Sequence, residues 1–579
     1  MRVFRHIALC LTLAAVASLL VAQKNGVDSE VARDPGNMAS TYVPLESWAY
    51  PAIERLAAFG YVETAIAGER PWTRMEFARL IEEAGDSDSN QGLDPEAARI
   101  YASLKQEFSE ELARRDGAAN LGATVESMYV RNTGIAGTPI TDGYHFGQTL
   151  VNNYGRPYGP GENNYSGVAL RAVAGSFAVY VRGESQRAGL EPSAPLSSQP
   201  LIAAADNYTN GAAAEPESGM ERLRLLDAYA SYTFKNNQLS VGQQSLWWGP
   251  GKGGPVLFSN NAEPVLMIRL DRTSPIELPS IGKWLGKIRF QLFWGRLEGQ
   301  QFDNDYGGIG VSQTTTNVVG SPGVALADQP FFNGQKFSFK FTRNFEFSVS
   351  KTGIYAGPGF PATLKSLLRS VFSAGNSPGA GDPGDRRSAV DVTYRVPWIR
   401  DWMTLYFDTF SDDEPFPLEY PKECVWSPGI YLAKLPHLPK ADFRMEGFLS
   451  PPRYIIPGYY YYNFHYLSGY TNSRELIGSW IGREGRGEQL WTTWWFSPQT
   501  SLQASFRNMS ADRDFLHGGN LHDFSVTSDI SVRPEWSVHV TGQLERWSFP
   551  VFASAPQNNF AITTELRYTP AKGHRWWSR

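Results

Sequence analysis

Apolar and polar residues alternate along many short runs in the second part of the chain. In the run 523–532, Phe524, Val526, Ile530 and Val532 are apolar, and every odd-numbered position is polar. Successive side chains of a β-strand point to opposite faces, so this alternation predicts strands with one apolar and one polar face. Comparable runs lie at 288–294, 337–341, 345–349, 536–544 and 560–568.

A helical pattern precedes the strands, over residues 43–116. Thr73 and Glu76 form a capping box, in which the hydroxyl and the carboxylate satisfy backbone N–H groups at a helix start. Asp94 and Pro95 suit the start of another helix. We therefore predict a compact bundle of three short helices. The apolar positions spaced for one helix face are Ile53, Leu56, Phe59, Phe77, Leu80, Ile81, Ile100, Leu104, Phe108 and Leu112.

The connections between strands fall into two length classes. Residues 342–344 join two Phe-rich strands and suit a tight turn on the periplasmic side of a membrane barrel, whereas long loops suit the external side. A short amphipathic helix is indicated among the long loops by Leu364, Leu367, Leu368 and Val371. The segments that lack strand periodicity and are predicted as extracellular loops are 185–218, 300–329, 373–388 and 414–458.

The composition suits a barrel in a membrane. Aromatic residues make up 13% of the chain, while the mean hydropathy is only −0.33. A transmembrane barrel needs this combination, because one strand face meets lipid, aromatic girdles mark both interfaces and the inner face is polar. We predict a mainly β fold: a large antiparallel barrel of roughly 16–18 strands over 117–570, with a small N-terminal α-helical bundle. An array of soluble β-sandwiches is the alternative, and the abundance of aromatic residues disfavours it.

The first residues predict export. Arg2 and Arg5 precede an apolar stretch that ends near Ala22, as in a signal peptide over 1–22. Beyond residue 25 no segment has the ~18 consecutive apolar residues of a membrane helix. We predict an outer-membrane protein of a Gram-negative bacterium, with a linker over 23–42, a periplasmic helical domain over 43–116 and a short tail over 571–579.

The net charge narrows the class of partner. The chain has 53 Lys and Arg against 58 Asp and Glu, a formal net charge of −5. This balance gives no reason to expect nucleic acid as a partner.

A sugar site is suggested by the segment around Trp247 and Trp248. Two indoles followed by Gly and Pro fit a strand end at which rings stack on sugar faces, while Asn260 and Asn261 bind hydroxyl groups. The alternative is that the tryptophans belong to an interfacial girdle and the asparagines to a turn. The same two interpretations apply to residues 459–462, beginning with Tyr459, and to His465, where the girdle interpretation is the stronger.

Arginines offer a second kind of contact. Arg386 and Arg387 lie in a Gly-, Asp- and Pro-rich loop, and Arg171, Arg289 and Arg296 lie on predicted strands. One interpretation is that these arginines contact an acidic polysaccharide. Internal ion pairs across a wet lumen are the favoured alternative, because a charged barrel interior requires such pairing.

The densest acidic cluster contains Asp408, Asp412, Asp413 and Glu414. Asp412, Asp413 and Glu414 are weak candidates to hold a hard cation such as calcium, and a solvated charged loop is the ordinary alternative. The eight histidines show no HExxH spacing, and no GxSxG elbow supports a hydrolase. We predict no catalytic residue, no enzyme activity and no cofactor.

Residues 242–262, here called the signature segment, resemble the capsule assembly Wzi family, whose members are outer-membrane barrels that organise capsular polysaccharide. Residues 43–45 and 70–73 resemble the N-terminal domain of that family, and residues 464–485 resemble a later part. The resemblance adds Arg483 to the candidate polysaccharide-binding residues. It implies three partners, namely capsular or exopolysaccharide, outer-membrane lipids and the capsule export machinery.

Two functions therefore follow from the sequence. The first is a non-enzymatic protein that binds and organises polysaccharide at the cell surface. The second is a sugar-selective porin, for which an aromatic track and luminal arginines would serve equally well.

Overall fold

The structure is a computed structural model. It describes residues 34–206, 220–279, 282–300, 302–303, 318–319, 329–357, 360–373, 384–412, 416–451, 456–463 and 466–570. The predicted signal peptide and the predicted tail lie outside these residues.

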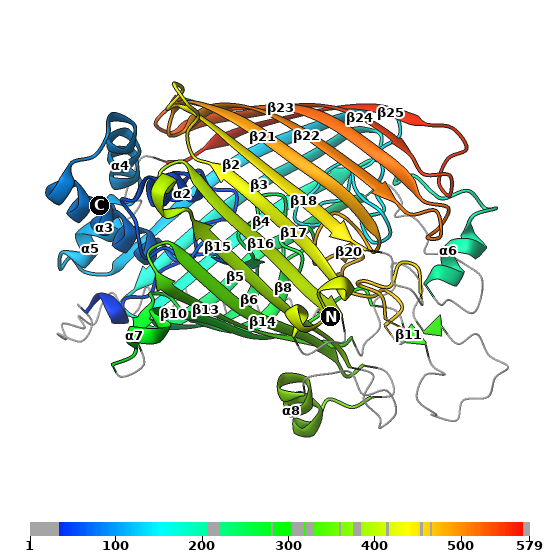
Figure 1. Cartoon of the computed structure of the whole chain (residues 1–579), viewed down its shortest axis with the longest axis horizontal. Coiled ribbons are helices and arrows are strands. Elements are labelled where there is room, and N and C mark those ends of the chain that lie inside the picture. Colours follow the sequence, from blue (N-terminus) through cyan, green and yellow to red (C-terminus); the bar gives the residue numbers. More distant parts are fainter. Residues whose placement is uncertain are drawn as a thin grey trace.

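Eighteen antiparallel strands form a closed barrel, which confirms the predicted fold and strand number (Figure 1). Each strand pairs with the next long strand in the sequence, and the last pairs with the first to close the ring. The strands are β2 (Leu121–Ala136), β3 (Gly161–Ala174), β4 (Phe177–Ala188), β5 (Met220–Phe234), β6 (Asn237–Gln244), β8 (Val265–Arg272), β10 (Lys287–Arg296), β13 (Phe331–Thr342), β14 (Phe345–Tyr355), β15 (Asp385–Arg395), β16 (Met403–Asp412), β17 (Cys424–Leu432), β18 (Ala441–Ser450), β21 (Gly485–Ser497), β22 (Thr500–Ala511), β23 (Gly519–Arg533), β24 (Trp536–Ser548) and β25 (Gln557–Tyr568).

Several two-residue strands accompany the barrel. They are β1 (Glu69–Arg70), which pairs with β7 (Trp247–Trp248), β9 (Ile276–Glu277), which pairs with β10, β11 (Phe302–Asp303), which pairs with β12 (Val318–Val319), and β19 (Thr471–Asn472), which pairs with β20 (Glu475–Leu476).

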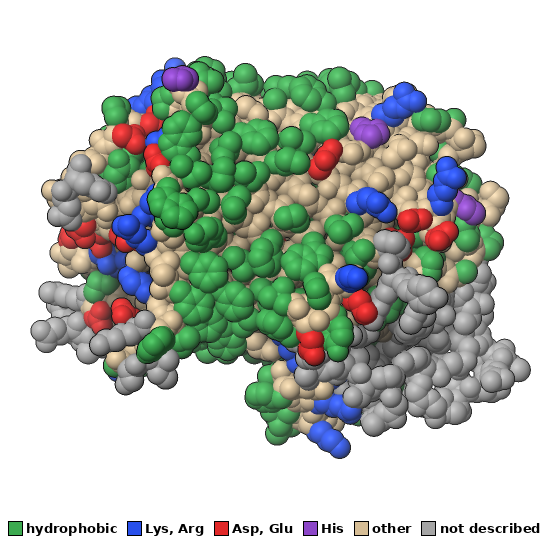
Figure 2. All heavy atoms as spheres, viewed as in Figure 1, with side chains coloured by type: hydrophobic (Ala, Val, Ile, Leu, Met, Phe, Trp, Pro, Cys, Tyr) green, Lys and Arg blue, Asp and Glu red, His purple; other side chains and the backbone are tan. Residues whose placement is uncertain are grey.

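The apolar face of the strands points outward, as the alternation predicted. On β23, Phe524 and Val532 are 47% and 58% exposed, while the side chains between them are mostly polar. Figure 2 shows the resulting apolar band on one side of the barrel, with charged side chains gathered mainly toward its two ends. Such a band is the surface that a transmembrane barrel presents to lipid. Among the described residues, no helix is long and apolar enough to cross a membrane.

The two ends of the barrel differ. One, here called the helical end, carries α2 to α5, together with short turns such as residues 343–344; the other, the loop end, carries the long connections (Figure 1). The helices are α2 (Ala49–Phe59), α3 (Arg74–Gln91), α4 (Pro95–Glu107), α5 (Ser109–Arg115), α6 (Gln199–Ala205), α7 (Gly282–Leu285) and α8 (Leu364–Phe372). The 3-10 helices are η2 (Pro35–Asn37), η3 (Pro397–Ile399), η4 (Pro417–Glu419) and η5 (Pro421–Glu423).

The helical bundle differs from its prediction in two details. The third helix is broken at Phe108, whose ring turns inward and stacks on Phe77 with ring centroids 4.9 Å apart, so that α4 and α5 are separate. Thr73 caps α3 by accepting a hydrogen bond from the Glu76 backbone N–H at 3.2 Å. The Glu76 carboxylate forms an ion pair with Arg79 at 2.7 Å and leaves the capping box half formed.

The prediction of one loop over residues 414–458 is wrong, because β17 and β18 lie within it. Pro428 and Gly429 interrupt the sequence signal of β17, yet both pair with β16. On β18 the alternation of polar and apolar residues covers only a few positions, because the outward Gly447 and the inward Phe448 break it. The predicted helix around residues 364–371 corresponds to α8.

Segments from the helical end enter the barrel. Residues 34–42, predicted as part of a linker, are largely buried, and the Tyr42 ring lies 4.1 Å from the guanidinium of Arg269 on the inner wall. Residues 65–72 reach further, where Glu69 forms an ion pair with Arg289 at 3.2 Å and accepts a hydrogen bond from Ser338 at 2.7 Å. Contacts with charged and polar side chains of the barrel wall therefore fix the segments that enter from the helical end.

Segments from the loop end enter the barrel from the opposite side. They carry apolar and aromatic side chains that pack on one another and on Phe293, Phe332 and Phe410 of the wall. We call this group the luminal core. Two loops supply most of its members. Residues 246–258 contribute Leu246, Trp248, Val256, Leu257 and Phe258, and residues 460–477 contribute Tyr460, Tyr461, Tyr466, Tyr470, Leu476 and Ile477.

Candidate functional site

The signature segment lies inside the barrel, and neither sequence interpretation of its tryptophans matches this position. Trp248 is 1% exposed, and its indole N–H donates to the Gln291 side chain at 2.7 Å. Trp247 is also buried and donates to the Gly251 carbonyl at 3.2 Å. Both residues pair with β1, which comes from the helical end. The tryptophans therefore join the chain segments that enter from the two ends.

Carboxylates of the barrel wall accept hydrogen bonds from the backbone of the glycine-rich part of this segment. Glu446 accepts hydrogen bonds from the backbone N–H groups of Lys252 and Gly253, at 2.6 and 2.8 Å. A Cβ atom on Gly253 would lie only 2.9 Å from both a Glu446 oxygen and the Phe448 ring, so glycine suits this close approach. Asp408 binds the Val256 N–H at 2.8 Å in the same way.

The Asn pair ties the signature segment to the neighbouring loops. Asn261 donates to the Leu476 carbonyl at 3.2 Å and accepts from the Asn152 backbone N–H at 3.0 Å. The Asn260 carbonyl accepts a hydrogen bond from the Tyr154 backbone at 2.8 Å. Both asparagines are buried, so these bonds hold three loops together. This arrangement is closer to the predicted turn than to an exposed sugar site.

The tyrosine run also belongs to the luminal core. Tyr461 is fully buried, and its hydroxyl donates to the Val256 carbonyl at 2.5 Å. Tyr459 is partly exposed and packs on the edge of the core. His465 lies outside the residues that the structure describes. The girdle prediction is thus wrong for Tyr460 to Tyr462, which are buried inside the barrel.

Arg483 fastens three loops at the loop end. Its guanidinium forms an ion pair with Asp206 at 2.6 Å and donates to the Gly458 and Ala205 carbonyls at 2.6 and 3.0 Å. It also lies over the rings of Tyr144, Tyr462 and Phe515. The side chain is 0% exposed.

His145 lies next to Arg483 and adds a second set of charged contacts between these loops. Its ring nitrogens lie 2.8 Å from Asp142 and 2.9 Å from Asp206. Burial alone would lower the pKa of His145, but the two carboxylates overcome it and raise the pKa to about 10. The pKa of Asp142 is lowered, because His145 outweighs the effect of burial. The imidazolium and Arg483 thus share Asp206.

The predicted arginines follow the ion-pair alternative where their partners are defined. Arg387 pairs with Asp385 and Asp412 at 2.6 and 3.0 Å. Arg171 pairs with Glu111 of α5 at 3.2 Å, and Arg289 pairs with Glu69 and Asp271. Arg386 is buried and 2% exposed, and Arg296 is partly buried at the end of β10.

The predicted cation site is not assembled by the described residues. Asp412 binds Arg387 and also accepts from the Tyr461 backbone N–H at 3.2 Å. Asp413 and Glu414 lie outside the described residues. Within the described part of the chain, no group of three or more His, Cys, Asp or Glu side chains could hold a metal ion.

A different set of polar side chains lies on the outer wall at the loop end. Glu488, Asn508, His522, Arg546 and Asn558 are direct neighbours across β21 to β25. We call this row the outer rim. Its side chains are exposed or partly exposed, and none makes a hydrogen bond or ion pair with the residues that the structure describes. They are therefore available to bind a ligand.

The outer rim was not predicted, although the sequence of the strands indicates it. The outward positions of β23 from Phe524 onward are apolar except Ser528, but His522 and Asn520 continue the same parity with polar side chains. The row next to the outer rim is apolar on all five strands. It consists of Leu490, Phe506, Phe524, Leu544 and Phe560. The change from apolar to polar at constant parity marks where the apolar band ends.

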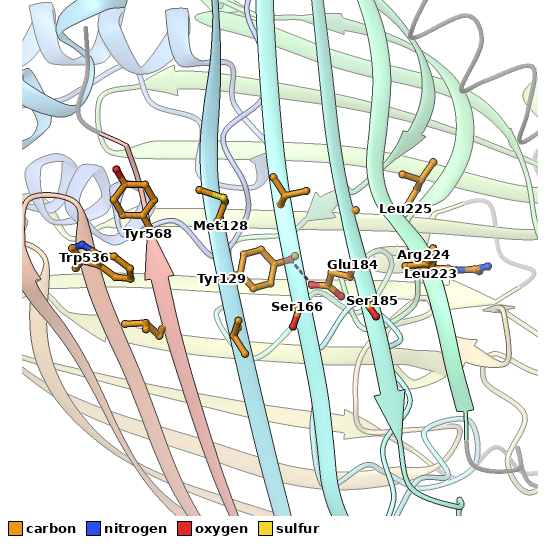
Figure 3. A pocket seen from close by; sticks show the side chains of 15 residues that line it. Met128, Tyr129, Ser166, Glu184, Ser185, Leu223, Arg224, Leu225, Trp536 and Tyr568 are labelled. Atoms are coloured by element: carbon orange, nitrogen blue, oxygen red, sulfur yellow. Dashed lines mark hydrogen bonds between the residues drawn. The ribbon is translucent and has the colours of Figure 1, made fainter. Parts of the chain in front are cut away.

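A hollow of about 780 Å³ on the outer wall has a different character. Figure 3 shows Met128, Leu223, Leu225, Trp536 and Tyr568 around it, while Tyr129 turns inward and donates a hydrogen bond to Glu184. Its lining is largely apolar and belongs to the outward face. Such a surface suits hydrocarbon better than a sugar.

The fold and these sites define a class: a transmembrane β-barrel whose lumen holds segments from both ends and whose outer wall carries an exposed polar row at the loop end. The family model of the capsule assembly protein Wzi matches residues 131–562. The chain belongs to this family, as the signature segment indicated, and is an outer-membrane β-barrel.

Two individual proteins illustrate the relationship. A Klebsiella pneumoniae protein described as an uncharacterized 55.8 kDa protein in the cps region is 22% identical over 201 residues, 34% of this chain. The match spans only 35% of that relative's length. The structure of Escherichia coli Wzi, described as an outer-membrane protein involved in group 1 capsule assembly and a carbohydrate-binding β-barrel, is 14% identical with a TM-score of 0.63. That match covers 92% of this chain and 100% of the other, and it shows a shared fold.

Proposed function

We propose that this protein is a non-enzymatic outer-membrane barrel that binds and organises capsular or related exopolysaccharide at the cell surface. In this proposal the helical end faces the periplasm and the loop end faces outward. The polysaccharide is the ligand, outer-membrane lipids surround the apolar band, and the helical domain is available to the capsule export machinery.

The observation that carries the proposal is the unpaired outer rim on a member of the Wzi family. Asn508 and Asn558 offer amide donors and acceptors that suit sugar hydroxyl groups. Arg546 offers a guanidinium that suits the carboxylates of an acidic polysaccharide. The row lies at the loop end, where a polymer outside the cell would reach it.

We propose a supporting role for the buried candidates of the signature segment. Trp247, Trp248, Asn260 and Asn261 hold the loops in place, and Arg483 fastens them at the mouth. Tyr459 is the candidate of this group with a partly exposed side chain, and we keep it as a direct contact.

The test uses cells in which the chain is replaced by Arg546→Glu combined with His522→Ala. We expect less cell-bound and more released polysaccharide, because the variant removes a cation and repels an acidic polymer. The matched control is Arg533→Glu, an exposed arginine at the opposite end of β23. Both variants must give the native amount of heat-modifiable barrel. Equal retention in the two variants would contradict a direct role of the outer rim.

A sugar-selective porin is the competing function, favoured by the many arginines on the inner wall. Against it, segments from both ends fill the lumen and meet at the β1 and β7 pair. Reconstitution in planar bilayers distinguishes the two. We expect no steady ion conductance, whereas a sugar-sensitive current would support the porin.

A further inference from the structure

We propose that α8 is an interfacial helix that binds anionic, phosphate-bearing lipids of the outer leaflet and anchors the loop end in the membrane. The inference goes beyond polysaccharide binding and rests on the outer-membrane location of the family. It arises from the juxtaposition of α8 with the outer wall of β13 and β14.

The helix packs on the outside of the barrel. Thr352 faces the lumen, where its hydroxyl accepts a hydrogen bond from Tyr470 at 3.0 Å, so its neighbours Lys351 and Gly353 face outward. Lys351 donates to the Val371 carbonyl of α8 at 3.2 Å. A Cβ atom on Gly353 would lie 2.6 Å from the Ser370 hydroxyl, so the helix lies directly on the strand.

Both ends of α8 are fixed. At the start, Thr363 and Ser366 form a reciprocal capping box. At the end, the Lys351 ammonium lies against the last carbonyl groups, where a cation complements the helix dipole. A further hydrogen bond joins Asn333 of β13 to Ser370 at 2.5 Å. The helix is therefore a built part of the outer wall.

The face of α8 turned away from the barrel is apolar. Leu364, Leu368 and Phe372 are spaced four residues apart on one side, and they are 70%, 47% and 78% exposed. Three large apolar side chains in one row would be costly to leave in water. Hydrocarbon is the environment that suits them.

Neighbouring aromatic side chains place α8 at the membrane interface. Trp294 stacks on Phe331 with ring centroids 5.2 Å apart, and Phe331 stacks on Tyr355 at 5.7 Å. The Trp294 indole also donates to the Tyr355 hydroxyl at 2.5 Å. These residues lie at the loop ends of β10, β13 and β14, two of which contact α8. Such aromatic clusters mark the level of the lipid headgroups.

The charge of α8 selects anionic lipid. The helix contains Lys365 and Arg369 and no acidic residue. Figure 2 shows apolar side chains on the side of α8 turned toward the helical end of the barrel and basic side chains on the opposite side. With the apolar side in the hydrocarbon, the basic side meets the headgroup layer, where phosphate groups lie.

The first experiment measures the depth of α8 in a bilayer. Phe372→Cys is spin-labelled in the full mature chain, with Cys424→Ser as background, and the barrel is reconstituted in phosphatidylcholine vesicles containing phosphatidylglycerol. The matched control is Leu196→Cys, an equally exposed apolar residue on another loop at the loop end. We expect the label at position 372 to be accessible to oxygen and shielded from an aqueous nickel complex, and the label at 196 to behave oppositely. Equal exposure of both labels to nickel would overturn the proposal.

The second experiment tests the lipid class. A fluorophore at position 372 is quenched by brominated phosphatidylglycerol or brominated phosphatidylcholine, added in equal amounts. We expect severalfold stronger quenching by phosphatidylglycerol and loss of that preference in Lys365→Glu with Arg369→Glu. Equal quenching by the two lipids in the native sequence would overturn the proposal. In the first experiment, dipolar broadening between spin labels would show a second copy covering this face and would also overturn it.

Two controls separate this result from others. Heat-modifiable migration confirms that each variant forms the barrel. Retention of polysaccharide, measured on cells carrying Lys365→Glu with Arg369→Glu, reports on the proposed function independently. Normal retention with lost lipid preference is the result that we expect.

Discussion

The inner and outer faces of the same few strands use polar residues in opposite ways. On β22 to β24, Arg507, Asp523 and Glu545 point inward at the loop end, where Arg507 forms ion pairs with both carboxylates. The adjacent outward residues Asn508, His522 and Arg546 have no partner among the described residues. Side chains one position apart thus belong to a closed internal network and to an open surface.

The difference shows why a family motif need not mark the ligand. The signature segment is rich in groups that bind sugars in other contexts, but inside the barrel the indole N–H groups of Trp247 and Trp248 and the Asn261 amide have internal partners, because an unpaired polar group is costly to bury. Trp248 accordingly packs in the luminal core, while Asn261 and the glycine-rich part bind the neighbouring loop and the barrel wall. The outer rim has no motif, since exposed polar residues are satisfied by water and carry no packing constraint.

The largest effect is expected from Arg483→Ala. The change leaves Asp206 with one cationic partner fewer and the Gly458 carbonyl without its donor, in a site from which water is excluded. Loss of one partner of a buried ion pair costs about 3–5 kcal/mol. Thermal unfolding of the barrel in detergent, followed by heat-modifiable migration, measures the loss.

The matched control for that variant is Arg486→Ala. Arg486 is exposed on β21, and its side chain makes no hydrogen bond or ion pair with a described residue, so its loss should change stability by no more than about 0.5 kcal/mol. Equal stability of the two variants would show that the ion pair and hydrogen bonds of Arg483 do not stabilise the loops.

A smaller loss of stability, about 3 kcal/mol, is expected from Trp248→Ala. The indole fills the luminal core beside Phe258 and Phe293, and its N–H satisfies Gln291. Trp398→Ala is the control, since Trp398 is 90% exposed. If polysaccharide retention fell in Trp248→Ala at native barrel stability, the tryptophan would contact sugar directly, contrary to its burial.

The sequence predicted the barrel well because its evidence was local. Alternation on β23, β24 and β25 reported which side chains face outward, and the capping residue Asp94 reported a helix start. β18 was missed because Gly447 and Phe448 cut its alternation short, and its inward charges, such as Arg444 and Glu446, have partners far away in the sequence. No local pattern reports those partners.

The candidate site was harder to predict for the same reason. The burial of Trp248 depends on the pairing of β7 with β1, which lies almost two hundred positions earlier in the chain. A motif gives the chemistry of its side chains but not whether their donors are already used. For Arg387 the sequence favoured an internal ion pair without identifying the partners, Asp385 and Asp412; Arg483 was a candidate for ligand binding and pairs with Asp206 in the fold.

A pH-dependent effect is expected from His145→Gln. The pKa of His145 is raised from 6.5 to about 10 in the folded protein. The charged ring therefore stabilises the fold fully below about pH 6.5, and this contribution is lost as the pH rises through about 10. We expect the variant to be about 1–3 kcal/mol less stable than the native protein near pH 6 and almost equal to it near pH 11. A difference independent of pH would show that the ring acts by packing alone.

The smallest effect, and the sharpest comparison, comes from two neighbouring residues of β24. Glu545 points inward and binds Arg507, Thr149 and Asn559, so Glu545→Gln should lower the free energy of unfolding by about 1–3 kcal/mol and leave polysaccharide affinity unchanged. Arg546→Ala should do the reverse: it should weaken binding of purified barrel to polysaccharide by about 0.5–1.5 kcal/mol, the usual contribution of one hydrogen-bonding group, and change stability by less than about 0.5 kcal/mol. Affinity is measured in detergent without added lipid, so that headgroups cannot occupy the outer rim. Loss of affinity in Glu545→Gln but not in Arg546→Ala would move the binding site from the outer wall to the loops that Glu545 supports through Thr149.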